Sequence, residues 1–536
     1  MAESRRDWLA LASLLALTAW ALLPSLRGEF VTDDYVFLTT SRMVDAPWQA
    51  FWQRHFYEPL YFRPVGLVVW WLTERCFGLN YAWHAALNAA LHLTNVALLW
   101  MLLRRFTSGA LTRVIGIGWF ALGPLSFPAV LWLSDRFDLL AVLFLLIVLL
   151  AAQSAQRVSG AVVVFLGALA ACWSKEWAFA GCFAALLGLA WAAWRARSRR
   201  FATVTGALLA ATLLTWIVRV AVSDGTGTTL MANAFSVSGL SAGVLAWAAA
   251  GGRIAAALGA GWSTAIFGGA CLISLALLSA KRSVLDQHSL QLIAGVAALL
   301  IALILPQTLT VSGYIGLIDT GIFGAATTAR FFYGPMVAIA AIAAVALSSP
   351  RLNGNARSFL IAISGACVVA FAVKGSVAAN EFSTWTQREI APFSIAAAAT
   401  TDAIAKEGGE PCAVVFLGTQ SQHPYFRMFS DVTVKARTAT PEKTWSCHVM
   451  TESTPWLFAF PLRVQPANLS LRDVPYIGDT PKPDSSWNSI RYRYRLPVGD
   501  LRMLPNARFF DWRTDHFVEV TDAIRRGDRN VKSQDW

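Results

Sequence analysis

Two adjacent carboxylates stand where the first long apolar run of the chain ends. They are Asp33 and Asp34, in the stretch "GEFVTDDYVF". A carboxylate can accept the proton of an attacking hydroxyl group, and a paired acid can position that group or bind a divalent metal through hard oxygen ligands. The same pair could instead cap the helix that follows, because aspartate is favoured at helix N-termini. Its chemistry depends on which other charged groups share its side of the protein.

Further polar residues recur at the ends of later apolar segments. In chain order they are His55, Glu58, Arg63, His84, Asn88, His92, Asp135, Arg136, Asp138, Lys175, Glu176, Arg219, Arg330 and Tyr333. Singly, each has a structural explanation as an interfacial anchor, a local ion pair or an interhelical hydrogen-bond partner. His84, Asn88 and His92 recur every four residues and therefore share one side of a helix. As a set, they predict a functional site, because ionisable groups at membrane depth are costly.

The elements that carry these residues are apolar and long. The chain has 536 residues, 56% of them hydrophobic and 14% charged, whereas a soluble domain carries about 25% charged residues. Apolar stretches of about 20 residues, the length of a membrane span, recur up to residue 376. The sequence therefore predicts an all-α polytopic membrane domain over 1–376 and excludes one large soluble globule. The net charge of +12 comes mostly from short clusters between the apolar runs, where it sets topology and does not indicate nucleic-acid binding.

Eleven spans are expected. They are 8–24, 83–103, 113–131, 137–152, 160–176, 177–194, 201–220, 261–280, 288–306, 331–348 and 358–376. Arginine clusters follow alternate spans, so the positive-inside rule places those loops and the N-terminus in the cytoplasm. The Ala/Gly-rich run at 235–260 is compatible with a re-entrant or surface helix, or with an additional pair of spans.

The opposite loops then share the outer face. The first external loop covers 25–82, and its segment 61–78 is expected to lie as a helix in the membrane interface. The tail, 377–536, is predicted to be a small extracytoplasmic α/β domain with a helix at 383–407 and a strand at 412–418. Cys412 and Cys447 lie in this tail and could form a disulfide in an oxidising compartment.

Acids and bases gathered on the outer face suit a lipid-linked anionic substrate. Lysine and arginine at helix ends can hold a phosphate at headgroup depth, and a carboxylate can activate an acceptor hydroxyl. The sequence therefore favours an outward-facing transfer site. A transporter or lipid flippase would need ionisable groups nearer the bilayer midplane and often shows internal repeats, and none is visible here. A non-catalytic membrane scaffold is the third alternative.

Several short motifs, taken in chain order, resemble the GT-C superfamily of integral-membrane glycosyltransferases. They are "TDDY", "YFRPV", "NYAWHAALNAALH", "WLSDRFDLLA", "WSKEWA", "WIVRV" and "ARFFYGP", and they cover about 30–340. The most similar branch is that of the protein O-mannosyltransferases, and within it the enzymes with transmembrane segments and tetratricopeptide repeats. No such repeats follow here, so the resemblance does not imply protein O-mannosylation.

The resemblance implies inverting sugar transfer from a polyprenyl-phosphate donor to an envelope glycan, a lipid or a protein such as pilin. Asp34 or Asp33 would be the general base, and Lys175, Arg219 and Arg330 would stabilise the leaving phosphate. The expected cavity residues are Asp135, Arg136, Asp138, His55, Glu58, Arg63, His84, Asn88, Glu176 and Tyr333. The need for a divalent metal is open. The expected location is the bacterial inner membrane, with the C-terminal domain in the periplasm.

Overall fold

The structure is a computed structural model of the whole chain. It describes residues 2–31, 33–43, 46–52, 62–107, 109–154, 158–222, 237–280, 299–304, 306–307, 318, 321–348, 354–407, 412–417, 437, 447–451, 457–459, 492–494, 507–513, 516–526. These residues form two compact units. The first unit is Met1–Leu26 with Ala82–Ser383, and the second is Arg27–Tyr81 with Thr384–Trp536. The first external loop therefore groups with the C-terminal tail, and the boundary expected after residue 376 falls inside a helix.

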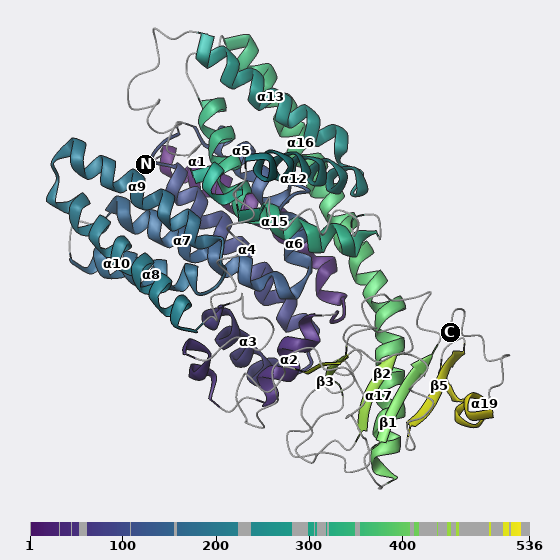
Figure 1. The fold of residues 1–536 in the computed structure, drawn as a ribbon. Coiled ribbons are helices and arrows are strands. Elements are labelled where there is room, and N and C mark those ends of the chain that lie inside the picture. Colours follow the sequence, from purple (N-terminus) through teal and green to yellow (C-terminus); the bar gives the residue numbers. More distant parts are fainter. Residues whose placement is uncertain are drawn as a thin grey trace. The chain divides into compact units, whose positions relative to one another are not determined.

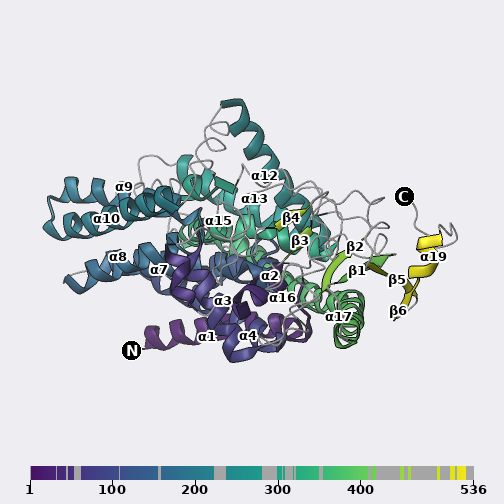
Figure 2. The same cartoon turned by 60° about the horizontal axis from the view of Figure 1, so that its bottom comes forward.

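The first unit is helical. Its described helices are α1 (Ala2–Leu22), α4 (Tyr81–Leu103), α5 (Ala110–Leu122), α6 (Phe127–Leu131), α7 (Arg136–Ser154), α8 (Val158–Cys172), α9 (Ala178–Ala196), α10 (Arg199–Val222), α12 (Val237–Ala257), α13 (Gly261–Ala280), α15 (Ile322–Ser348) and α16 (Gly354–Trp385). Helix α7 packs against α8, α8 against α10, and α10 against α9. Both views show these four helices side by side (Figures 1 and 2).

Several of these helices could cross a membrane, as the sequence predicts. Within the described ranges, five are long and apolar enough, and they are Arg5–Arg27, Tyr81–Leu103, Phe201–Val222, Ile322–Ser348 and Arg357–Ile404. The first three coincide with the expected spans 8–24, 83–103 and 201–220, and the last two contain the expected spans 331–348 and 358–376. The described part of the Ala/Gly-rich run at 235–260 includes the helix α12. The expected span at 288–306 lies mostly outside the described residues.

One expected span is not continuous. The segment 113–131 divides into α5 and the short α6, separated by the turn Gly123–Ser126. Pro124 lies in this turn, and Pro128 lies at the start of α6. Proline has no N–H group to donate and its ring disfavours a helical residue before it, so α5 ends before Pro124. A new helix begins at Phe127, and Pro128 is tolerated in its first turn because the N–H groups there have no intrahelical partner.

Helix α15 forms the core of the first unit. Of its most apolar window, 83% is buried, and it packs against α5. The approach is close at Gly116, where an added Cβ atom would lie 2.6 Å from the backbone nitrogen of Ala344. Small residues at such crossings let helix backbones pack tightly without polar side chains.

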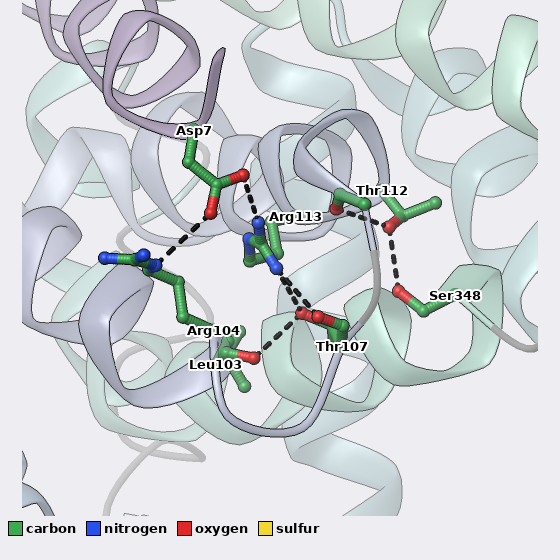
Figure 3. Close-up of polar contacts among 8 residues, drawn as sticks. Asp7, Leu103, Arg104, Thr107, Thr112, Arg113 and Ser348 are labelled. Carbon is green, nitrogen blue, oxygen red and sulfur yellow. Dashed lines mark hydrogen bonds and ion pairs between the residues drawn. The ribbon is translucent and has the colours of Figure 1, made fainter. Parts of the chain in front are cut away.

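A charged cluster ties α1 to α5 and to the loop that precedes it (Figure 3). The Asp7 carboxylate forms two ion pairs. Its Oδ1 lies 2.5 Å from Arg113 Nη2, and its Oδ2 lies 3.3 Å from Arg104 Nε. Arg113 also donates to the carbonyl oxygen of Thr107 at 2.7 Å, and its side chain is only 4% exposed. The Asp7 carboxylate therefore balances a guanidinium that has almost no access to solvent.

The second unit contains a mixed sheet and several helices. The sheet order is β2 (Cys447–Thr451), β1 (Cys412–Leu417), β5 (Ala507–Arg513), β6 (His516–Glu519), with β1 parallel to both neighbours and β6 antiparallel. Its helices include α2 (Asp33–Met43), α3 (Pro64–Phe77), α17 (Ala391–Lys406) and α19 (Thr521–Arg526). Helix α17 packs against β2 and β6 (Figure 2).

The core of this sheet is aromatic. Phe393 of α17 packs with Phe416 of β1 and Phe510 of β5. The side chains Val414–Leu417 of β1 are all buried, as expected of a central strand with parallel neighbours on both sides. The expected strand at 412–418 is confirmed in β1, and the small C-terminal sheet agrees with the predicted α/β tail. The structure also has a helix, α3, within the segment expected to be helical at 61–78.

Candidate functional site

Two predicted site residues form an ion pair in the first unit. Asp138 lies in the first turn of α7, and Lys175 lies in the turn that joins α8 to α9. The Lys175 Nζ atom is 2.8 Å from Asp138 Oδ2, and the indole nitrogen of Trp177 donates to Asp138 Oδ1 at 2.7 Å. The Asp138 side chain is 1% exposed and that of Lys175 is 12% exposed. We refer to these two residues as the Asp138–Lys175 pair.

The fold explains why this pair forms. Helices α7 and α8 are antiparallel neighbours that pack along their lengths, so the start of α7 lies beside the end of α8. The motifs "SDRFD" and "WSKEW" occupy those two positions. The helix packing brings Asp138 of the first motif and Lys175 of the second to the same end of the two helices, so each charge has a partner. Trp177 donates to the other carboxylate oxygen of Asp138.

A buried guanidinium lies two residues before Asp138. The Arg136 side chain is fully buried; its Nε donates to Asn88 Oδ1 at 2.9 Å and its Nη2 donates to the carbonyl oxygen of His84 at 3.2 Å. Asp135 is also buried, at 1% exposure. His84 and Asn88 therefore hold Arg136 from α4, as interhelical hydrogen-bond partners of the kind that the spacing of four predicts.

A second network lies further along α4. His92 Nε2 contacts the carbonyl oxygen of Ala121 at 2.9 Å, and His92 Nδ1 contacts the Tyr333 hydroxyl at 2.8 Å. A carbonyl oxygen only accepts, so Nε2 carries the proton and Nδ1 accepts from Tyr333. The Tyr333 oxygen in turn accepts from Asn95 Nδ2 at 3.1 Å. Tyr333 is fully buried in this network, which links α4, α5 and α15.

Arg219 and Glu176 lie at or next to helix ends, whereas Arg330, expected at the start of the span 331–348, lies more than two turns inside α15 because that helix starts at Ile322. Arg330, on α15, has its guanidinium 5.2 Å from the ring centre of Trp132, which lies next to the turn that carries Asp135. Arg219 is in the last turn of α10 and is half-buried. Glu176 is half-buried in the turn between α8 and α9. Stacking on an aromatic ring suits arginine, because its planar guanidinium is weakly hydrated.

The carboxylate pair lies in the second unit. Asp34 is 1% exposed, and its Oδ2 accepts a hydrogen bond from the backbone N–H of Val31 at 3.0 Å. The Asp34 N–H in turn donates to the Val31 carbonyl oxygen at 3.0 Å. Asp34 therefore closes the turn that leads into α2. Asp33 is half-buried at the first residue of the same helix.

Tyr35 and Tyr81 surround this turn. The Tyr35 hydroxyl accepts from Arg437 at 2.8 Å, and Arg437 also pairs with Glu29 at 3.4 Å. Burial raises the pKa of Tyr35 to about 12. The Tyr81 hydroxyl packs against Gly28, where an added Cβ atom would lie 2.7 Å from it. The glycine that opens "GEFVTDDYVF" is therefore needed for the close approach of Tyr81.

The remaining predicted site residues are Arg63, His55 and Glu58. Arg63 is half-buried at the residue before α3. His55 and Glu58 lie outside the described residues. Across the described ranges, no group of three or more His, Cys, Asp or Glu side chains is arranged to hold a metal ion. The structure therefore brings together Asp138 with Lys175 and Arg136 with His84 and Asn88, all within the first unit.

Sequence reasoning did not identify Trp177, Asn95, Glu29 or Arg437. Trp177 and Asn95 complete hydrogen-bond networks around predicted residues. Arg437 reaches Tyr35 from 402 positions away in the chain, and nothing in its local sequence marks it. A single polar residue without a periodic or motif context gives no sequence signal for a contact of that kind.

No protein-family model matches the chain. No curated protein matches it either.

Proposed function

We propose that the chain is a multi-pass membrane glycosyltransferase that moves a sugar from a polyprenyl-phosphate donor to an acceptor outside the cytoplasm. The observation that carries the proposal is the Asp138–Lys175 pair. It joins "SDRFD" and "WSKEW", two motifs about 40 residues apart whose residues the resemblance to GT-C enzymes assigns to one substrate site. Nothing about helix packing alone requires charges there, since apolar residues of similar volume can be as stable as a buried ion pair.

The charges in the first unit are costly and clustered. Arg136, Asp138 and Lys175 lie at the ends of adjacent apolar helices, and two of them are essentially inaccessible. Ionisable groups kept in such surroundings usually mark a substrate path or a site for charge stabilisation. A lysine and arginines at this level suit the phosphate of a lipid-linked donor, because fixed positive charge in a low-dielectric site stabilises a leaving anion.

The proposed transfer is a single displacement. Asp34 takes the proton of the acceptor hydroxyl, and the hydroxyl oxygen forms a bond to the anomeric carbon of the sugar. The bond between that carbon and the phosphate oxygen breaks, and polyprenyl phosphate leaves as an anion with the configuration of the sugar inverted. Lys175, Arg219 and Arg330 offset the charge of the departing phosphate. Asp138 holds Lys175 in place in the absence of substrate.

This function places the N-terminus in the cytoplasm and the second unit outside it. Arginine clusters at 104–113 and 195–200 would then face the cytoplasm, as the positive-inside rule requires. In a bacterium, the membrane would be the inner membrane. The acceptor would be an envelope glycan, a lipid or a protein.

The test is sugar transfer in membrane vesicles from cells whose polyprenyl-linked sugars carry a radioactive label. Wild-type vesicles should lose label from the polyprenyl-phosphate pool and gain it in an acceptor fraction. Asp34→Asn and Lys175→Ala should each lower that transfer at least 100-fold, since a general base alone contributes about 10²–10⁴-fold. The matched control is Asp402→Asn, which removes a carboxylate from an exposed ion pair with Lys406. Near wild-type transfer by both site variants would refute the proposal.

A further inference from the structure

An apolar pocket lies in the first unit, away from the charged residues already described. It is narrow and partly open to its surroundings, so a ligand would lie against its walls and not inside an enclosed cavity. Its walls come from the break between α5 and α6, the turn between α12 and α13, and the middle of α16. Its lining includes Pro124, Phe127, Leu258, Phe371, Lys374 and Ala378.

The pocket follows from the interruption of a helix. Because the chain turns at Gly123–Ser126, α5 does not continue across the space that a straight helix would fill. Helix α16 passes this gap closely: an added Cβ atom at Gly375 would lie 3.2 Å from the Phe127 ring. The walls are almost entirely apolar, and such a surface groove between helices is readily covered by a hydrocarbon chain.

Lys374 is the charged residue of this pocket. Its side chain is exposed, and an added Cβ atom at Gly259 would lie 3.2 Å from its Nζ atom. Gly259 has a φ of +61° and ends the turn after α12, so the ammonium group lies over a backbone that has no side chain. Within the residues that the structure describes, this ammonium has no hydrogen bond or ion pair.

The position of Lys374 along α16 matches the thickness of a bilayer. It is twenty residues after Gly354, the start of the helix, which corresponds to about 30 Å of helix. The hydrocarbon core of a bilayer is also about 30 Å thick. When the start of α16 lies at one interface, the ammonium of Lys374 therefore lies at the level of the headgroup phosphates of the opposite leaflet.

We propose that this pocket binds an anionic phospholipid, with the phosphate on Lys374 and one acyl chain against Phe127, Leu258 and Phe371. A cation at headgroup depth beside an apolar space between helices is the arrangement that recognises an acidic lipid head. A single ammonium matches a single phosphate diester, as in a phosphatidylglycerol. The site uses none of the residues assigned to sugar transfer, so either proposal can fail without the other.

The test is lipid binding to the purified full-length protein, measured by native mass spectrometry after delipidation. Phosphatidylglycerol and phosphatidylcholine with identical acyl chains are titrated separately. The wild type should bind phosphatidylglycerol about five- to tenfold more tightly, since one lysine near a membrane surface is worth about 1 kcal/mol. Lys374→Gln should abolish that preference, and Lys374→Arg should keep it.

Two further variants distinguish the contribution of the apolar walls from that of the Lys374 charge. Ala378→Leu fills the pocket and should weaken binding of both lipids, because the acyl chain loses its place. Lys406→Gln removes a comparably exposed lysine of α17 and should change neither affinity. Equal preference for phosphatidylglycerol in the wild type and in Lys374→Gln would overturn the site. Unchanged lipid binding in Ala378→Leu would show that Lys374 only anchors the helix at the membrane surface and that no acyl chain lies in the pocket. That result would also overturn the proposed site. Tighter, Lys374-dependent binding of polyprenyl phosphate than of phosphatidylglycerol would assign the pocket to another lipid and overturn the proposal.

Discussion

The Asp138–Lys175 pair allows stability and function to be tested separately. The substitution Asp138→Asn keeps the shape of the side chain and an acceptor for the Trp177 indole nitrogen, but it removes the negative charge 2.8 Å from Lys175. Lys175 is then left 12% exposed without that partner. Breaking a buried ion pair from one side costs about 3–5 kcal/mol. Since Lys175 keeps some access to water, we expect Asp138→Asn to lower the free energy of unfolding by about 3 kcal/mol, the lower end of that range.

The double variant Asp138→Asn/Lys175→Met removes both charges. Because no unpaired charge is left, it should be more stable than the sum of the two single substitutions predicts. The expected coupling energy is about 1–3 kcal/mol, within the range for residues in direct contact. The matched control is the exposed pair of Asp402 and Lys406, for which the same cycle should give only about 0.2–1 kcal/mol.

The assay is unfolding of the purified protein in detergent micelles, followed by tryptophan fluorescence over a denaturant series. Additivity of the two single substitutions within about 0.5 kcal/mol would refute the inferred pairing. Sugar transfer is then measured for the same variants. The double variant should recover stability without recovering transfer; full recovery of transfer would show that the pair has a structural role only.

Three other predictions follow from the described contacts. Asp7→Asn should lower the free energy of unfolding by about 3–5 kcal/mol, because Arg113 is only 4% exposed and loses its counter-ion; a loss below about 1 kcal/mol, measured by denaturant unfolding, would contradict this. Burial raises the pKa of Tyr35 to about 12, so its neutral form stabilises the fold fully below about pH 10 and progressively less as the pH rises through 12. Stability should therefore fall more steeply over this range in the wild type than in Tyr35→Phe, and identical pH profiles would exclude the effect. Cys412 and Cys447 are register partners on adjacent parallel strands, where Cα atoms about 5 Å apart permit a disulfide; thiol alkylation before reduction should spare both residues, and labelling of both would disprove the bond.

Hydropathy predicted the helices of the first unit well, but not where proline interrupts them. Pro124 ends a helix, whereas Pro335 lies within α15, which continues through it. The difference comes from packing. Neighbouring helices enclose α15 along almost its whole length, and in such surroundings a helix tolerates proline because adjacent groups satisfy the freed carbonyl. The composition of a single segment does not contain that information.

The sequence identified the charged motifs of the candidate site, but it did not show which of their side chains contact each other. The charged motifs "SDRFD" and "WSKEW" stand out because charges are rare in apolar sequence. Their sequence does not show that Asp138, rather than Asp135, meets Lys175, because the rotation of α7 about its axis decides which side chain faces the turn. The contact of Arg437 with Tyr35 was beyond sequence reasoning for a related reason. It depends on the tertiary packing of segments that are remote in the chain.

The most direct test of the proposed function is mass spectrometry of envelope glycans, glycolipids and glycoproteins from cells with and without the gene. The account predicts that one sugar modification disappears on deletion, returns with the wild-type gene, and does not return with Asp34→Asn at equal protein levels in the membrane. An unchanged envelope after deletion, or full restoration of a lost modification by Asp34→Asn, would contradict it.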